Sequence, residues 1–205
     1  MVAGVILAAG QARRMGQAKQ LLLLHEKPMV WHIAMTACQS MLDQVIVITG
    51  AYQREVTSTL NDLPLQIIHN ENWQQGQSTS VKKAVQSISA EMQAVVFLLA
   101  DQPLVDVSLI NELINGYHET NASIIIPRAL KKPGNPVLFD LKVWRPALLQ
   151  LSGDEGGRQI IRGNQEAIHY IELLDGQCFF DVDTPLEYET MKKMWNLMKE
   201  DRTPQ

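Results

Sequence analysis

The chain has 205 residues, of which 46% are hydrophobic and 20% are charged, and its formal net charge is −4. This composition is typical of a globular protein, and the length suffices to bury a substantial core in a single domain. The sequence has no basic tract and no interleaved basic and aromatic residues, which disfavours nucleic acid as a partner. Any anionic ligand must therefore be held by a few well-placed cations.

The N-terminal segment, residues 2–9, is apolar, but it is too short to span a membrane and no basic residue precedes it. It therefore predicts a buried strand and no membrane association. The two cysteines, Cys38 and Cys178, belong to no CxxC pair and have no histidine at metal-ligand spacing. We expect a cytoplasmic protein without a disulfide framework or a zinc site.

In the first half of the chain, short apolar runs alternate with segments of helical spacing. Strands buried on both faces are predicted at 2–9, 44–49, 65–69 and 94–100. Helices are predicted between them, at 28–41, 51–61 and 78–90. This order is typical of a doubly wound α/β domain with a mostly parallel sheet and right-handed crossovers.

The second half of the chain is less regular and predicts a mixed C-terminal part. Strands are expected at 123–127, 135–139 and 167–173, with a turn at 131–134. Helices are expected at 140–150, at 155–163 and after Thr184-Pro185, followed by a frayed polar tail at 196–205.

Ligands of open α/β sheets bind beyond the carboxyl ends of the strands. Three segments there carry polar groups: "LAAGQARRMGQAK" (7–19), "NENWQQGQSTS" (70–80) and Asp101-Gln102-Pro103. We expect them to converge on one edge of the sheet, where they would bring together groups that bind phosphate and a carboxylate.

The loop at 7–19 combines two glycines with basic side chains. Gly10 and Gly16 allow tight turns whose amides can form an anion nest, and Arg14 and Lys19 add positive charge. The spacing matches neither the dinucleotide fingerprint GxGxxG nor the Walker A motif. From the residues alone, a basic surface loop that the glycines merely turn stays open as an alternative.

Asp101 ends an apolar strand, and an Asp before a turn often caps the next helix. That helix is predicted to begin nearer Asp106 or Ser108, which leaves Asp101 to face the crevice. Asp183, before Thr184-Pro185, can be read as the start of the last helix.

The motif "LAAGQARRMGQAKQLL" resembles the signature LAxG-x3-R-M-G-x2-K-x-L of nucleotidyltransferases that activate molybdenum cofactor and sugars. The further blocks "NENWQQGQSTS", "LLADQP", "PGNPVLF", "LSGDEGGR" and "DVDTPLEY" resemble, in order, those of the molybdenum cofactor cytidylyltransferase branch of the MobA-like NTP transferases. The similarity covers residues 2 to about 190 and implies a single domain with a Rossmann-like, GT-A-like fold. It divides into a nucleotide-binding half at about 1–105 and an acceptor-binding part at about 106–195.

The resemblance also implies the site residues. Arg14, Lys19 and Asp101 would be catalytic, and Asp101 and Asp183 would hold Mg²⁺, with Asp181 as a weaker rival. The residues expected to bind the nucleotide are Leu7, Ala8, Ala9, Gly10, Arg14, Lys19, Asn70, Gly76, Ser80 and Asp101. Those expected to bind the acceptor are Gly134, Asn135, Pro136, Asp154 and Arg158.

Several of these residues also have a structural interpretation. Asn70 can donate to and accept from a base edge, whereas Trp73 is interpreted as a packing residue. Ser78 or Thr79 is expected to cap the helix that follows, and Asp154 to cap a helix beginning near residue 155. Asn135 stands where the family usually has His.

The implied reaction transfers CMP from CTP to the phosphate of molybdopterin and releases pyrophosphate, in support of a molybdenum hydroxylase such as xanthine dehydrogenase. The "LAAG" and "DQP" motifs favour CTP, because the guanylyl branch tends to carry "LAGG" and the methyl group of Ala9 would narrow the base pocket. The alternatives are a GTP-using or sugar-phosphate nucleotidyltransferase, and a non-enzymatic protein that delivers the cofactor.

Overall fold

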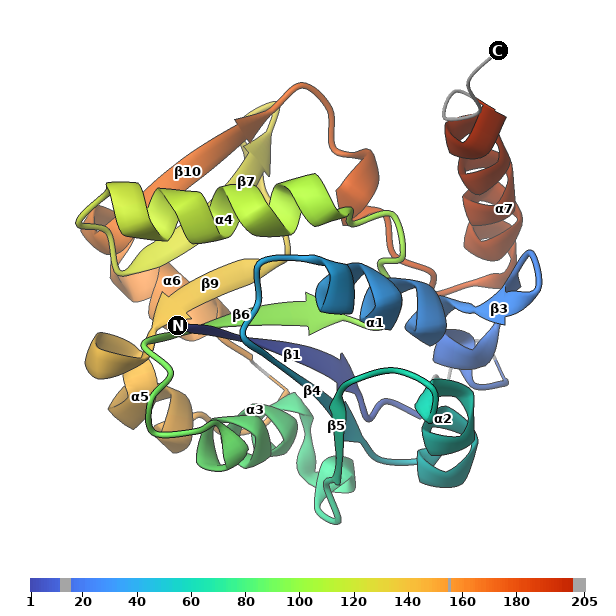
Figure 1. The fold of residues 1–205 in the computed structure, drawn as a ribbon, viewed down its shortest axis with the longest axis horizontal. Coiled ribbons are helices and arrows are strands. Elements are labelled where there is room, and N and C mark those ends of the chain that lie inside the picture. Colours follow the sequence, from blue (N-terminus) through green and yellow to red (C-terminus); the bar gives the residue numbers. More distant parts are fainter. Residues whose placement is uncertain (12–15, 155, 201–205) are drawn as a thin grey trace.

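The computed structural model describes residues 1–11, 16–154 and 156–200, and an open sheet forms its centre (Figure 1). In the described residues this sheet has eight strands in the order β10-β7-β9-β6-β1-β4-β5, with β8 paired to β7. The strands are β1 (Val2–Ala8), β4 (Gln44–Thr49), β5 (Gln66–His69), β6 (Ala94–Leu99), β7 (Ile124–Ala129), β8 (Lys132–Pro133), β9 (Val137–Asp140) and β10 (Ile168–Leu173). A separate hairpin is formed by β2 (Leu23–Leu24) and β3 (Lys27–Pro28).

β1 lies in the middle of the parallel part of the sheet. It pairs in parallel with β4 and β6, so that Ile6 is opposite both Val47 and Leu98. β9 runs antiparallel between β6 and β7, while β10 is parallel to β7. The central strands are buried on both faces, which explains their nearly continuous apolar sequences. The predicted fold, a mostly parallel sheet with a mixed C-terminal part, is confirmed.

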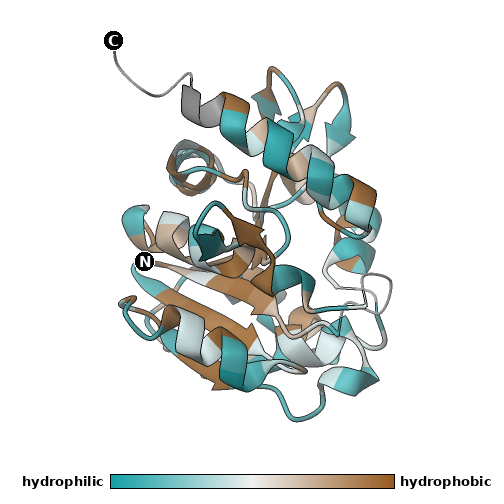
Figure 2. Ribbon diagram, turned by 90° about the vertical axis from the view of Figure 1, so that its right-hand side faces the viewer, coloured by the Kyte–Doolittle hydropathy of each residue, from teal (hydrophilic) through white to brown (hydrophobic). Residues whose placement is uncertain are grey.

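Helices cover both faces of the sheet and bury a core on each. The core with α1, α2 and α4 contains Ile6, Ile33 and Leu113, and the core with α3, α5 and α6 contains Val5 and Val85. In Figure 2 the strands are mostly brown, whereas the helices mix teal and brown. The helices are α1 (Met29–Gln39), α2 (Gln53–Leu60), α3 (Gln77–Ser87), α4 (Val107–Glu119), α5 (Leu141–Gln150), α6 (Arg158–Gly163) and α7 (Pro185–Glu200).

The last helix, α7, packs away from the sheet, beside the β2–β3 hairpin (Figure 1). Met191 on α7 is fully buried in a third, smaller core with Leu24 and Met29. The Tyr188 hydroxyl donates a hydrogen bond of 2.6 Å to the carbonyl of Leu23. Helix α7 continues to Glu200, and the rest of the tail predicted at 196–205 lies outside the described residues.

Two local predictions need correction. The chain reverses at Leu130 and Lys131, which have φ of 49° and 66°, and Lys132–Pro133 forms β8, so the turn shares only Lys131 with the predicted 131–134. Two successive residues in the left-handed region are typical of the tight hairpin turns that match strand twist. α6 begins at Arg158 instead of near residue 155.

None of the helices in the described ranges is both long enough and apolar enough to cross a membrane.

Candidate active site

A cleft of about 620 Å³ lies beyond the carboxyl ends of β1 and β6. It unites segments that are far apart in the sequence, as expected for this edge of an α/β sheet. The predicted nucleotide-binding residues that line it are Leu7, Ala8, Ala9, Gly10, Lys19, Gly76, Ser80 and Asp101. A wider hollow of about 840 Å³, at the opposite edge of the sheet beside Gln93 and Asp140, contains none of the predicted site residues.

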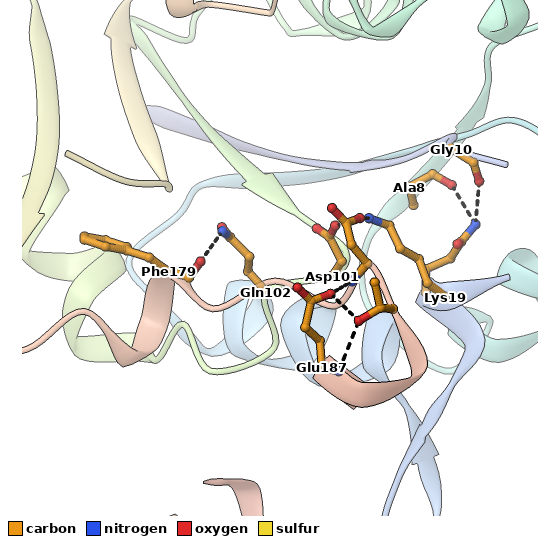
Figure 3. A network of polar contacts seen from close by, with 10 residues as sticks. Ala8, Gly10, Lys19, Asp101, Gln102, Phe179 and Glu187 are labelled. Carbon is orange, nitrogen blue, oxygen red and sulfur yellow. Dashed lines mark hydrogen bonds and ion pairs between the residues drawn. The ribbon is translucent and has the colours of Figure 1, made fainter. Parts of the chain in front are cut away.

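Lys19 is the central charge of the cleft. It begins a 3-10 turn, Lys19–Leu21, and its Nζ donates hydrogen bonds to the carboxylate of Asp101 and, at 2.8 Å, to Oδ1 of Asp183 (Figure 3). These three side chains retain 21%, 14% and 24% of their exposure, respectively, so each can still be reached by a ligand. The two acids that the sequence analysis assigned to a metal therefore converge on one cation.

The charges in this part of the cleft do not balance. Burial lowers the pKa of Lys19, but the charges of and hydrogen bonds to Asp101 and Asp183 outweigh it, so the pKa is raised and the ammonium stays protonated. Partial burial and the charges of Asp101 and Asp183 raise the pKa of Asp181, which also lines the cleft. Among the residues that the structure describes, the carboxyl groups of Asp101, Asp181 and Asp183 thus lie near one ammonium, an arrangement that attracts further positive charge.

The donor set fits a hard divalent cation. Mg²⁺ is commonly bound by one or two carboxylates, with substrate phosphates and water completing its octahedral shell. Asp101 and Asp183 supply such a pair. In the part of the chain that the structure describes, no three His, Cys, Asp or Glu side chains form a metal cage.

Asp183 is turned toward the cleft because other residues cap α7. The Thr184 hydroxyl accepts a hydrogen bond of 3.3 Å from the Glu187 backbone N–H and donates one to the Glu187 carboxylate. That carboxylate also accepts a hydrogen bond of 2.9 Å from the backbone N–H of Asp183. These bonds resemble a capping box, so the helix start does not need the Asp183 side chain. Similarly, Asp106 caps α4 through the Leu109 N–H, which leaves Asp101 at the cleft as predicted.

Gln20, which the sequence analysis did not single out, braces the first loop. Its side chain is only 3% exposed, and its Nε2 donates to the carbonyls of Ala8 and Gly10 at 3.4 and 3.2 Å (Figure 3). Arg14, which was predicted to be catalytic, lies outside the described residues. The role of Gln20 follows from its burial, which only the structure shows, because buried amides need hydrogen-bond partners.

Asn70 differs from its predicted role. It is 2% exposed and does not line the cleft. Its amide nitrogen donates to the hydroxyls of Thr79 and Ser80 at 2.8 and 3.0 Å, and its oxygen accepts from the Asn72 N–H. Asn70 therefore holds Ser80 in place, and Ser80 itself lines the cleft.

One further prediction in this segment is wrong, and Trp73, which was left out of the predicted site, lies at the cleft. Helix α3 begins at Gln77, and neither Ser78 nor Thr79 caps it; the Thr79 hydroxyl instead donates back to the Gly76 carbonyl. Trp73, interpreted as a packing residue, lines the cleft together with Gln77.

Gly76 packs against the segment that carries Asp154, a predicted acceptor-binding residue. Its φ is +108°, and a Cβ there would lie 2.5 Å from the carbonyl oxygen of Gly153. The Ser78 N–H also donates to that carbonyl. Asp154 consequently lines the cleft and does not cap α6, whose N-terminal flanking residue is Gly157. Arg158 is exposed at the start of α6 and is absent from the cleft lining.

The remaining predicted acceptor-binding residues, 134–136, do not line the cleft, although Gly134 packs against Phe179. Gly134 lies so close to Phe179 that a Cβ would be 2.3 Å from the ring. The Phe179 carbonyl accepts a hydrogen bond of 3.0 Å from Nε2 of Gln102 (Figure 3). Gln102 thus ties the Asp101 loop to the segment that carries Asp181 and Asp183.

This geometry has a clear chemical capacity. A cleft with a glycine-containing loop, one ammonium and a pair of carboxylates suited to a divalent cation can bind a polyphosphate as its metal complex. The sequence profile of the MobA-like NTP transferase domain matches residues 4–170. The chain belongs to the MobA-like NTP transferase family. This is a family of nucleotidyltransferases, enzymes that take nucleoside triphosphates as substrates.

Three relatives of this MobA-like chain match along nearly its whole length. Purine catabolism protein PucB of Bacillus subtilis (strain 168) is 31% identical, with 93% of this chain and 95% of PucB covered. Molybdenum cofactor cytidylyltransferase of Escherichia coli (strain K12) is 26% identical over the same shares of the two chains. Nicotine blue oxidoreductase of Paenarthrobacter nicotinovorans is 28% identical, with 89% and 92% covered.

A solved structure agrees with the MobA-like fold. The homologue of Mycobacterium tuberculosis rv0371c from Mycobacterium sp. strain JC1 has a TM-score of 0.85 to this chain at 29% identity, covering 96% of this chain and 98% of that one.

Proposed function

We propose that this protein is a Mg²⁺-dependent cytidylyltransferase that transfers CMP from CTP to the terminal phosphate of molybdopterin-type cofactor. The placement of the Lys19 ammonium between Asp101 and Asp183, in a cleft at the carboxyl edge of the sheet, is the observation that carries this proposal. The similarity along most of the chain to PucB and to molybdenum cofactor cytidylyltransferase supports the choice of acceptor.

The reaction needs alignment and charge neutralisation more than proton transfer. An oxygen of the acceptor phosphate attacks the α-phosphorus, and the bond from that phosphorus to the bridging oxygen of the β-phosphate breaks, so that pyrophosphate leaves. A phosphate monoester has a second pKa of about 6 and is largely dianionic at neutral pH, so no general base is required. Accordingly, no histidine occurs among the described residues that line the cleft.

The side chains of this site have separable roles. Lys19 and the amides of the loop at Gly10 would hold the β- and γ-phosphates and stabilise the leaving pyrophosphate. Asp101 and Asp183 would hold Mg²⁺, which when bound neutralises charge on the reacting phosphates. Ala9 and Ser80 would contact the nucleoside, and Asp154 would face the acceptor. Arg14 stays a predicted phosphate ligand.

The test is product analysis with purified protein, Mg²⁺, molybdopterin cofactor and each of the four nucleoside triphosphates in turn. We expect pyrophosphate release and a CMP adduct by mass spectrometry with CTP only. A GMP adduct with GTP would contradict the base assignment but keep the reaction class. If no nucleotide forms an adduct, the proposal is wrong.

A matched pair of variants tests the site. Asp101→Asn removes a carboxylate that would hold Mg²⁺ at the reacting phosphates and should lower turnover by about 10²–10³-fold while the thermal unfolding midpoint is retained. Asp62→Asn removes the same charge at an exposed position outside the cleft and should leave turnover unchanged. Normal turnover of Asp101→Asn would refute the assigned role of Asp101.

A further inference from the structure

We propose that Lys19 has a second role, as a positioning residue that occupies the place of the divalent cation until a nucleotide arrives. In the nucleotide-free protein its ammonium would hold Asp101 and Asp183 together, so that the metal ion binds tightly only with the nucleotide. This inference rests on the proposed function, because it takes these two carboxylates as the metal ligands.

The first ground is that Lys19 is the cation on which the two carboxylates meet. Asp101 follows β6 and Asp183 precedes α7, and the ammonium of Lys19 hydrogen-bonds to both. Another tie between the two segments, from Gln102 to the Phe179 carbonyl, lies several residues before Asp183. Without a cation at this point the two carboxylates would repel each other.

The second ground is that the ammonium and a metal ion would compete. Mg²⁺ binds carboxylate oxygens at about 2.0–2.1 Å and demands a nearly octahedral shell. The Lys19 ammonium donates to oxygens of both carboxylates, its bond to Asp183 being 2.8 Å long. A divalent ion on the same oxygens would also repel the ammonium. Lys19 must therefore leave the carboxylates before the ion can take both.

The third ground is that Lys19 can leave without moving the loop. Gln20 is buried and hydrogen-bonded to the carbonyls of Ala8 and Gly10, which anchors the backbone next to Lys19. The four-carbon stem of a lysine has several rotatable bonds and ends in three donors. A triphosphate in the cleft would give the ammonium a new anionic partner and release the carboxylates to the metal ion. The exchange is thus confined to one side chain.

The inference is tested by metal binding without turnover. We would titrate Mn²⁺ into wild type, Lys19→Met and Lys193→Met without nucleotide, and measure free Mn²⁺ by electron paramagnetic resonance. Lys19→Met should bind Mn²⁺ about tenfold more tightly than wild type, a coupling of ordinary size. Lys193 is exposed on α7 outside the cleft, so Lys193→Met, which loses the same charge, should bind as wild type does. Equal or weaker binding by Lys19→Met would overturn the inference.

A second measurement uses wild type alone, in case Lys19→Met fails to fold. The non-hydrolysable α,β-methylene analogue of CTP should tighten Mn²⁺ binding to wild type at least tenfold. Mn²⁺ binding that is equally tight with and without this analogue would also overturn the inference. Neither measurement involves the acceptor or the product. If the CMP adduct forms but Lys19→Met does not gain Mn²⁺ affinity, the inference fails and the proposed function stands.

Discussion

At the scale of single residues, the walls of the cleft depend on two buried amide side chains, those of Asn70 and Gln20. The side-chain amide of Asn70 donates hydrogen bonds to the hydroxyls of Thr79 and Ser80. That of Gln20 donates to the carbonyls of Ala8 and Gly10. Both side chains are almost fully buried. Buried amides with satisfied hydrogen bonds fix neighbouring groups in one geometry, and here they fix the walls of the cleft.

Gly76 is the backbone position for which a substitution is expected to cost most. Gly76→Ala combines a φ of +108° with a Cβ placed 2.5 Å from the Gly153 carbonyl oxygen, and should lower the free energy of unfolding by about 1–3 kcal/mol. Gly163→Ala is the matched control, since no atom lies within 4 Å of its Cβ and it should be neutral or slightly stabilising. Urea unfolding measures both. Equal stability of the two variants would show that the contact between Gly76 and Gly153 is not tight in solution.

At the scale of elements, α7 links Asp183 in the cleft to the β2–β3 hairpin. Its first turn is capped by Thr184 and Glu187, and Asp183 directly before it bonds to Lys19. Further along, Met191 and Tyr188 pack α7 against the β2–β3 hairpin, which follows the Lys19 turn. Helix α7 is therefore held to the segment 19–24 at two points, through Asp183 to Lys19 and through Tyr188 to Leu23.

The cap of α7 can be tested with two threonines of one helix. Thr184→Ala removes the hydroxyl that accepts from the Glu187 N–H and should lower the free energy of unfolding by about 1 kcal/mol. Thr190→Ala removes a hydroxyl that donates to the Leu186 carbonyl inside the helix, and it should be neutral or stabilising because alanine favours helix interiors. Chemical denaturation decides between them. A loss for Thr190→Ala as large as that for Thr184→Ala would refute the assignment of the cap.

At the scale of the whole molecule, the two edges of the sheet differ in chemistry. The cleft with its charged side chains lies at the carboxyl edge of the sheet. At the opposite edge, the Tyr117 hydroxyl donates a hydrogen bond of 3.0 Å to the Asp140 carboxylate. The same carboxylate accepts the Lys142 N–H at the start of α5. This contact ties α4 to the end of β9 and the start of α5. Helices α4 and α5 lie on opposite faces of the sheet.

The contact between Tyr117 and Asp140 predicts a dependence of stability on alkaline pH. Burial, together with the hydrogen bond to Asp140 and its charge, raises the pKa of Tyr117 to about 12, whereas an unfolded tyrosine has a pKa of about 10. The folded state holds the proton more firmly, so this stabilisation is complete below about pH 10 and disappears as pH rises to about 12.

Tyr117→Phe removes the titrating group and the hydrogen bond together. Wild type should be the more stable of the two at neutral pH, and urea unfolding curves should show this advantage shrinking between about pH 10 and 12. The other titrating groups are common to both proteins and cancel in the comparison. An advantage that stays constant over this range would contradict the raised pKa of Tyr117.

The sequence by itself predicted most strands and helices in chain order, but not the β2–β3 hairpin or β8. It also predicted that Asp101 lies at the carboxyl end of the sheet, where the structure places it in the cleft together with Asp183. That these two acids hold a metal ion is implied by the family resemblance and stays a prediction. Buried strands and amphipathic helices each have a characteristic spacing of apolar residues that can be recognised within a short segment. Asp101 directly follows an apolar strand, and Asp183 directly precedes the Thr184-Pro185 start of the last helix. The prediction that Asp101 stays clear of the next helix was correct because Asp106 supplies that cap.

Only the tertiary structure decided which distant groups meet. Lys19 reaches Asp183 across 164 residues, Gly76 packs against Gly153, β9 enters antiparallel between β6 and β7, and α7 docks on the β2–β3 hairpin. The inward turn of Asn70, the exposure of Trp73 to the cleft and the late start of α6 follow from the same packing. A local pattern reports how a segment folds, but its partner is selected by shape and charge across the whole chain, which no short window of sequence contains.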